Sequence, residues 1–250
     1  MSFINIFYTF AFIIFNTILM ATEIYFNTFL GEIVAADFRT AEIFKNSGID
    51  FCCGGKKTLE QACKDKNLDP NLIIQKLKEL EIIPLRTSHN FKDWELDFLA
   101  DYIVNIHHKY VLKTMPDLMF YTKKIASVHG STHPELIEVE NIVEKLSTEL
   151  LTHLKKEEEV LFPAIKEALR ANSKKIKTTI IAEIGRMIVE HEFAGDALDQ
   201  IKSMTSNYHL PVDACNSYRV CFQLMQQFED NLHIHIHLEN NILYPKALAL

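Results

Sequence analysis

Residues that interrupt helices are scarce in this sequence. Glycine and proline occur seven times each among 250 residues, below the average usage of both. The stretches between them are rich in leucine, isoleucine, lysine and glutamate, which favour helices. The composition therefore predicts an all-helical protein, and its hydrophobic content of 48% is enough for a substantial core.

A basic surface and a disulfide framework are also missing. The net charge is −7 and the pI is near 5.9, so lysine and arginine are not in surplus to neutralise phosphates, and we expect no nucleic-acid partner. The five cysteines are an odd number, and Cys52 and Cys53 are adjacent, which is a poor arrangement for paired disulfides. This usage favours a reducing compartment, and we expect a cytoplasmic protein.

The front of the chain lacks the flanks of an export signal. Residues 3–20 are almost wholly apolar and Glu23 is the first charge, so length alone fits a membrane span or a signal sequence. No lysine or arginine precedes this run, and no small-x-small cleavage site follows it. We therefore expect residues 1–19 to be an extension ahead of a native start at Met20, without stable membrane association.

Residues 27–82 have the pattern of a small helical module. Apolar residues recur at helical spacing from Ile33 to Phe44, and Ser47-Gly48 is expected to end this first helix. Two more helices are expected to begin with a capping box and with an N-cap before proline. The residues concerned are Thr58 with Gln61, and Asp69 with Pro70.

The module contains the loop F-C-C-G-G, in which Cys52 and Cys53 precede two glycines. Adjacent cysteines rarely bond to each other, and two thiols are too few to complete a structural zinc site. Two interpretations stay open. The cysteines are either small apolar residues in a tight turn, or a reactive or metal-contacting pair that the glycines leave accessible.

After a linker over residues 83–90, four long helical patterns predict an up-down four-helix bundle over residues 91–250. The patterns cover residues 91–128, with an interruption at Pro116, and residues 134–171, 173–206 and 212–250. Such bundles build metal sites from side chains that point inward from facing helices.

One motif occurs twice in the predicted bundle. The sequence reads H-L-K-K-E-E-E-V-L-F-P from His153 and H-I-H-L-E-N-N-I-L-Y-P from His235, so a glutamate, Glu157 or Glu239, follows each histidine by four residues. That step places imidazole and carboxylate on one helical face. A single pair of this kind is usually a surface contact. Here apolar neighbours turn both pairs inward, where an unpartnered carboxylate is costly, and the two pairs predict the halves of a dinuclear metal site.

The first and third helices offer further ligands. The third contributes His191, and the first offers His107 and His108, between which helical phase alone does not choose. Mixed nitrogen and oxygen donors suit iron, and carboxylates that bridge two metals are usual in di-iron bundles. Ligand type leaves zinc and manganese as alternatives.

The remaining histidines are expected to face solvent. On the last helix His233 and His237 lie about 160° from His235 on the helical wheel and are assigned to the outer face. Three more fall in the linker or in helix breaks: His89, His133 and His209.

At these motifs the sequence resembles the repair of iron centres family, whose members are hemerythrin-like di-iron proteins. The resemblance covers about residues 29–248. In the module it rests on L-G-E, G-I-D-F-C-C-G-G-K-K-T-L and L-D-P. In the bundle it rests on I-H-H-K-Y-V-L-K-T-M-P-D-L, V-H-G-S-T-H-P-E-L, E-H-E-F-A-G-D and the two repeated motifs.

The resemblance implies a non-haem centre of two oxo-bridged iron ions and selects its ligands. They are His108 rather than His107, His153, Glu157, His191, His235 and Glu239, with both glutamates bridging. The family also keeps a histidine at the position of His129, as an additional ligand or a supporting residue. His129 lies 21 residues past His108, about 31 Å along a straight helix, so it reaches the metals only if Pro116 redirects the chain.

The function implied by the resemblance is repair of iron–sulfur clusters damaged by oxidative or nitrosative stress, by iron supply rather than by catalytic turnover. Its partners would be damaged iron–sulfur proteins, met transiently, with O₂ or NO as small ligands and a homodimer as one possible assembly. The alternative is a hemerythrin-type carrier, sensor or NO-reducing module. Cys52 and Cys53 discriminate between the two, since O₂ carriage needs no thiols.

Overall fold

The computed structural model describes residues 25–82, 90–171 and 173–250. These residues are helical without a strand, which confirms the all-helical prediction, and their one extended pairing is an isolated bridge between Phe29 and Thr58. They fall into two compact units, which meet in the chain between Lys92 and Asp93. The apolar run with Met20 lies outside the described residues, and so do residues 83–89 of the linker, which include His89. Within the described ranges, no helix combines the length and hydropathy needed to cross a membrane.

The first unit is the small module. Its elements are α2 (Leu30–Ala36), α3 (Thr40–Asn46), the 3₁₀ turn η1 (Cys53–Lys56), α4 (Leu59–Asp65) and α5 (Pro70–Glu81). Their buried apolar faces meet in a core that includes Leu30, Val34, Phe44, Leu59 and Leu77. The loop with the two cysteines connects α3 to α4 in the chain and is therefore supported by this core.

The predicted first helix is divided in two at Asp37. Asp37 is extended and ends α2. Its carboxylate accepts hydrogen bonds from the backbone and guanidinium of Arg39, and its carbonyl accepts one from the Thr40 hydroxyl. These local bonds compete with helix propagation, and apolar spacing gives no signal of them.

The predicted starts of the next two helices are confirmed. Thr58 and Gln61 form a reciprocal capping box at the start of α4. Asp69 caps α5 by accepting from the Asn71 N–H, with Pro70 as the first helical residue. Each cap satisfies amide groups that have no partner within the helix.

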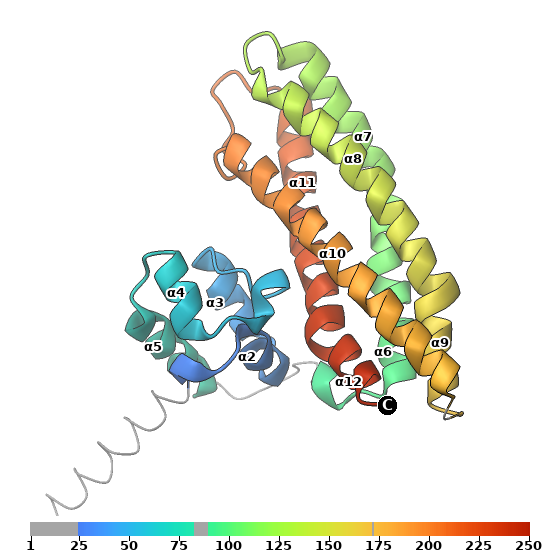
Figure 1. Cartoon of the computed structure of the whole chain (residues 1–250). Helices are drawn as coiled ribbons and strands as arrows, with labels where there is room; N and C mark the ends of the chain where they lie inside the picture. The colour runs from blue at the N-terminus through green and yellow to red at the C-terminus, as the bar shows by residue number, and fades with distance from the viewer. Residues whose placement is uncertain (1–24, 83–89, 172) are drawn as a thin grey trace, which may run out of the picture. The chain divides into compact units, whose positions relative to one another are not determined.

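The second unit is a four-helix bundle, and Figure 1 shows its long helical runs side by side. The first run is α6 (Leu96–Tyr102), η3 (Ile103–His108) and α7 (Lys109–His129). The second is α8 (Glu135–Lys156), η4 (Glu157–Leu161) and α9 (Phe162–Ala168), and the third is α10 (Lys174–Met204). The fourth is α11 (Asn216–Leu238), η5 (Glu239–Leu243) and α12 (Tyr244–Leu248).

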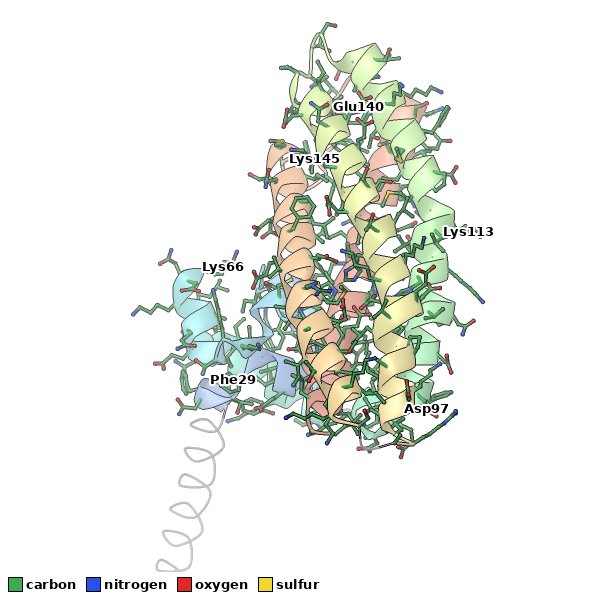
Figure 2. The ribbon with its side chains drawn as sticks, turned by 45° about the vertical axis from the view of Figure 1, so that its right-hand side comes forward. Phe29, Lys66, Asp97, Lys113, Glu140 and Lys145 are labelled. Atoms are coloured by element: carbon green, nitrogen blue, oxygen red, sulfur yellow. The ribbon has the colours of Figure 1, made fainter. Side chains whose placement is uncertain are left out.

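The bundle buries apolar faces and exposes charged ones. Helix α7 packs on α8 and α11, and α8 packs on α10. Figure 2 shows Lys113 and Lys145 on the outside of α7 and α8. Fourteen polar side chains of the described bundle residues are nevertheless buried, and the six predicted metal ligands are among them.

Pro116 does not interrupt the first run, contrary to the prediction. Helix α7 continues through Pro116 to His129. Proline removes the hydrogen bond that the carbonyl of residue 112 would accept. Both Leu112 and Pro116 are exposed, so water can satisfy that carbonyl and the helix continues.

Three segments of the bundle are π-helical: η3, η4 and η5. In a π turn each backbone hydrogen bond spans one more residue than in an α-helix, and such turns are frequent at functional sites. His108 ends η3, Glu157 begins η4 and Glu239 begins η5. The irregular turns of the bundle thus coincide with predicted metal ligands.

Candidate metal centre

The six predicted ligands lie together inside the bundle, and two of them are shared. Each of two groups offers four ligand atoms that lie within 4.8 Å of one another. One group is His108, Glu157, His235 and Glu239, and the other is His153, Glu157, His191 and Glu239. All six side chains are buried. Each group thus has two imidazoles of its own and shares the same two carboxylates with the other group. This is the donor arrangement of a dinuclear site with bridging carboxylates.

Nitrogen and oxygen atoms of the two groups face each other at short range. Glu157 Oε2 lies 3.3 Å from His108 Nε2 and 3.2 Å from His153 Nε2. Glu239 contacts His235 Nε2 at 3.0 Å through Oε1 and His191 Nε2 at 3.2 Å through Oε2. Every histidine of the site presents Nε2 to the centre.

The outer ring nitrogens of three histidines are held by partners that the sequence did not identify. His108 Nδ1 contacts Glu158 Oε1 at 2.8 Å, and His153 Nδ1 contacts Glu190 Oε2 at 2.9 Å. His191 Nδ1 contacts the side-chain oxygen of Asn240 at 2.9 Å. An acceptor at Nδ1 fixes the tautomer that leaves the Nε2 lone pair directed inward, as ligating histidines require.

The Leu-aromatic pair in each repeated motif also supports the site. Tyr244 donates a hydrogen bond of 2.6 Å to Glu157 Oε1, and its ring stacks on His191 at 5.9 Å between centroids. In the other copy, Phe162 stacks on His108 at 5.7 Å. The aromatic residue at the same position in both motifs indicated a shared role, but the packing of the helices determines which ligand each aromatic ring contacts.

The electrostatics of the centre favour a cation. Burial opposes ionisation of Glu157, but the imidazoles of His153 and His108 hold its pKa well below the usual range. Burial likewise opposes protonation of His153, but Glu157 and Glu190 raise the pKa of His153 to about 10. Two ionised carboxylates buried this closely repel each other unless positive charge lies between them.

Several polar atoms at the centre have no hydrogen-bond partner. They are His108 Nε2, Glu157 Oε2 and Glu239 Oε2, which are all buried and make the nitrogen–oxygen contacts given above without a hydrogen bond. A buried polar atom without a partner normally costs stability. Metal ions among these atoms would remove that cost, so the residues present fit a metal centre.

His107 and His108 are both buried, which explains why helical phase did not choose between them. His108 belongs to the ligand groups, whereas His107 Nδ1 lies 3.2 Å from Asn231 Oδ1. Burial and the neighbouring His235 lower the pKa of His107 to about 4. The π turn of η3 changes the angular step between successive residues and allows both side chains to face inward.

The expected outward position of His237 is wrong. His237 is fully buried, and its Nδ1 lies 3.1 Å from Asn241 Nδ2. Residues 235–239 are all buried, so this stretch has no solvent face and the helical-wheel argument does not apply to it. His233 is partly buried and lies 4.0 Å from Glu229.

The structure does not bring His129 to the metal centre. His129 ends α7, about 30 Å from His108 at the rise of a helix, and belongs to neither ligand group. Its Nε2 lies 3.2 Å from Cys215 Sγ, and this contact lowers the pKa of Cys215. His133 is partly buried rather than exposed and contacts Asp213 at 3.1 Å, whereas His209 is exposed as expected.

The two adjacent cysteines form part of a third group of possible ligands. All five cysteines lie in the described part of the chain, and none is in a disulfide. Asp50, Cys52 and Cys53 offer one ligand atom each within 4.8 Å of one another. Cys52 is buried, and Cys53 is partly exposed.

Family models cover most of the chain. The model described as the hemerythrin HHE cation binding domain matches residues 99–247, and a model described as a domain of unknown function (DUF542) matches residues 26–81. The first match spans the whole donor cluster. Together with the buried histidines and glutamates, it indicates that the bundle binds metal.

Curated relatives match both units. The iron-sulfur cluster repair protein ScdA of Staphylococcus epidermidis is 31% identical over 216 residues, 86% of this chain and 95% of the relative. The iron-sulfur cluster repair protein YtfE of Enterobacter sp. is 34% identical over 223 residues, 88% of this chain and 96% of the relative. A probable iron-sulfur cluster repair protein of Haemophilus influenzae is 36% identical over 222 residues, again 88% and 96%.

Proposed function

Since the chain belongs to the family of hemerythrin-domain iron–sulfur cluster repair proteins, we propose that it restores iron–sulfur clusters damaged by oxidative or nitrosative stress. The three relatives carry cluster repair in their names, and the match spans nearly their full length. They do not favour the alternative of a carrier, sensor or NO-reducing module. In this proposal damaged iron–sulfur proteins are transient partners.

The observation that carries the proposed metal centre is the sharing of Glu157 and Glu239 by two groups of histidines. We propose that the cofactor is a pair of iron ions, bridged by both glutamates and by an oxo group as isolated in air. Two imidazole nitrogens and two carboxylate oxygens per ion suit iron in either common oxidation state. Four protein donors leave positions open for a small ligand or for release of the metal.

The chemistry that the iron pair would supply is exchange of iron and binding of small ligands. The residues of this chain prepare that chemistry in three ways. Glu158, Glu190 and Asn240 hold the outer imidazole nitrogens, so the inner lone pairs remain available. Tyr244 keeps its proton, because burial and the nearby glutamates raise its pKa well above the usual value, and its hydroxyl donates a hydrogen bond to Glu157. Burial of the ligands limits access of water.

The chemistry of the proposed substrate and of the thiols supports a proposal for the compartment. Exposed iron–sulfur clusters and reduced cysteines persist where thiols are kept reduced. Cys53 is partly exposed and is not in a disulfide. We place the protein in the cytoplasm for this reason.

Repair activity is tested with an iron–sulfur dehydratase inactivated by NO or peroxide. Native protein loaded with iron should restore dehydratase activity, and Glu157→Leu should not. Cys52→Ser/Cys53→Ser should keep the iron of the bundle and lose repair. If the iron-loaded native protein gives no more reactivation than the same amount of free ferrous iron, the proposed function is wrong.

A further inference from the structure

The carboxylate of Asp50 is fixed beside the two thiols by the main chain. Asp50 Oδ1 accepts hydrogen bonds from the backbone N–H groups of Cys52 at 2.9 Å and of Cys53 at 3.1 Å. Asp50 Oδ2 accepts from the N–H of Gly54 at 2.7 Å. Three amide groups therefore set the position of one carboxylate, at little cost in side-chain entropy.

The sulfur atoms lie against this carboxylate. Cys52 Sγ is 3.1 Å from Asp50 Oδ1, and the two sulfur atoms and a carboxylate oxygen lie within 4.8 Å of one another. A side chain at position 54 would press on Asp50, because a Cβ there would meet Asp50 Oδ2 at 3.1 Å. The glycine that follows the cysteines thus permits the close approach of the carboxylate.

The 3.1 Å separation of Cys52 Sγ from Asp50 Oδ1 and the 4.8 Å limit on the other separations bracket the ligand spacing around a small metal ion. At metal–sulfur and metal–oxygen bond lengths of about 2.3 Å and 2.0 Å, tetrahedral coordination separates ligand atoms by about 3.5–3.8 Å. The amide groups hold the Asp50 carboxylate in place, so closing on an ion requires changes chiefly in the side-chain torsion angles of Cys52 and Cys53. A site of two thiolates and one carboxylate selects borderline or soft divalent metals over Mg²⁺ and Ca²⁺.

We propose that Asp50, Cys52 and Cys53 form a second metal site, which binds one divalent transition-metal ion such as Fe²⁺. Each thiol releases its proton to solvent on binding, and no electron is transferred. Three donors leave a fourth position open, whereas structural sites close their coordination with four protein ligands. An open position allows exchange of the ion with a ligand from another protein.

The role of this site in iron transfer rests on the proposed repair function, but its ability to bind metal does not. Within the described residues, the thiolate donors distinguish it from the bundle, whose clustered donors are imidazoles and carboxylates. The two sites can therefore be observed separately in one protein. Thiolate ligands give Co²⁺ an intense charge-transfer absorption in the near ultraviolet, and nitrogen and oxygen donors do not.

The test is a Co²⁺ titration of the full-length protein under anaerobic, reducing conditions. A Cys215→Ser background removes the exposed thiol beside His129. The native loop should produce a thiolate band whose final intensity corresponds to one Co²⁺ per loop. Cys52→Ser and Cys53→Ser should each reduce the band by at least half, and Asp50→Asn should weaken Co²⁺ binding at least tenfold.

Two substitutions in the same module serve as controls. Asp69→Asn changes the aspartate that caps α5, and Cys63→Ser changes a buried thiol. Both variants should leave the band and the Co²⁺ affinity unchanged. Circular dichroism checks that each variant is folded. The proposal is overturned if the native loop gives no band, if the band survives Cys52→Ser/Cys53→Ser, or if Asp50→Asn binds Co²⁺ as tightly as the native loop. Failure of repair with an intact band would count against the proposed function alone.

Discussion

The bundle centre and the cysteine loop assemble their donors in opposite ways. The six donors of the bundle centre come from four helical runs and are spread over the chain from His108 to Glu239. The three donors of the loop lie within residues 50–53. The first site therefore requires the whole bundle to fold, whereas the second requires one turn on a packed base.

The two sites also differ in what holds their donors in place. In the bundle, side chains from other helices do so, such as Glu190 on α10 for His153 on α8. In the loop, amide groups of the same turn hold the carboxylate of Asp50. We therefore expect changes in the bundle to act through packing and charge, and changes in the loop to act locally.

The largest expected effect comes from removing a shared carboxylate. Glu157→Leu or Glu239→Leu should abolish binding of both ions in the bundle, because each glutamate belongs to both groups. Metal analysis of the purified variants measures this, with the partly buried His233→Ala as the control that keeps both ions. Retention of the full metal content by both glutamate variants would contradict the assignment. Loss of Co²⁺ binding by the cysteine loop in these variants would contradict the independence of the two sites.

A smaller effect on metal binding is expected from changing Glu190, the residue that holds the outer nitrogen of His153. Glu190→Gln keeps a carbonyl oxygen for His153 Nδ1 but removes the charge, and should weaken metal binding about 10- to 100-fold. Competition with a chelator measures the affinity. The exposed Glu192, two residues along α10, provides the control Glu192→Gln, which should bind metal like the native protein. Equal affinities in the two variants would exclude Glu190 as a support of the site.

The pH dependence of the metal-free bundle tests the charge of the centre. Against burial, Glu157 and Glu190 raise the pKa of His153 from 6.5 to about 10. Protonated His153 therefore stabilises the metal-free fold fully below about pH 6.5, and this contribution is lost as the pH rises towards 10. Thermal unfolding should show a Tm that falls over this range without metal. With metal bound, this loss should disappear, because His153 is then coordinated through its deprotonated nitrogen.

The control for this measurement is His153→Gln, which has no proton to lose in that range. Its metal-free Tm should fall less steeply with pH than that of the native protein. Parallel curves for the two proteins would mean that His153 is neutral in the metal-free bundle.

The smallest expected effect is a difference in reactivity between a thiol of the bundle and a thiol of the cysteine loop. Cys215 is exposed at the N-cap of α11, and the contact with His129 lowers the pKa of the Cys215 thiol. Cys52 is buried, and the neighbouring Cys53 together with burial raises the pKa of the Cys52 thiol well above the usual value. A thiol reagent near pH 7 should therefore modify Cys215 before Cys52. His129→Ala should slow modification of Cys215 several-fold, as measured by mass spectrometry of peptides. An unchanged rate would show that His129 does not activate Cys215.

The repeated motif is local enough to be interpreted from the sequence. A histidine and a glutamate four residues apart share a helical face in any helix, so both pairs were predicted before the helices were placed. The capping box at Thr58 and the N-cap at Asp69 were predicted for the same reason, since each depends on neighbours within three residues. Resemblance to a family was needed to choose His108 over His107, because both are buried.

Only the tertiary structure decided which side chains support the ligands. Glu158, Glu190 and Asn240 contact histidines 50, 37 and 49 residues away in the sequence, and no periodicity within one helix specifies such partners. The buried position of His237 and the continuation of α7 through Pro116 also depend on surroundings rather than on local pattern. Helical spacing determines which residues share a face, but the packing of one helix on another determines what that face meets.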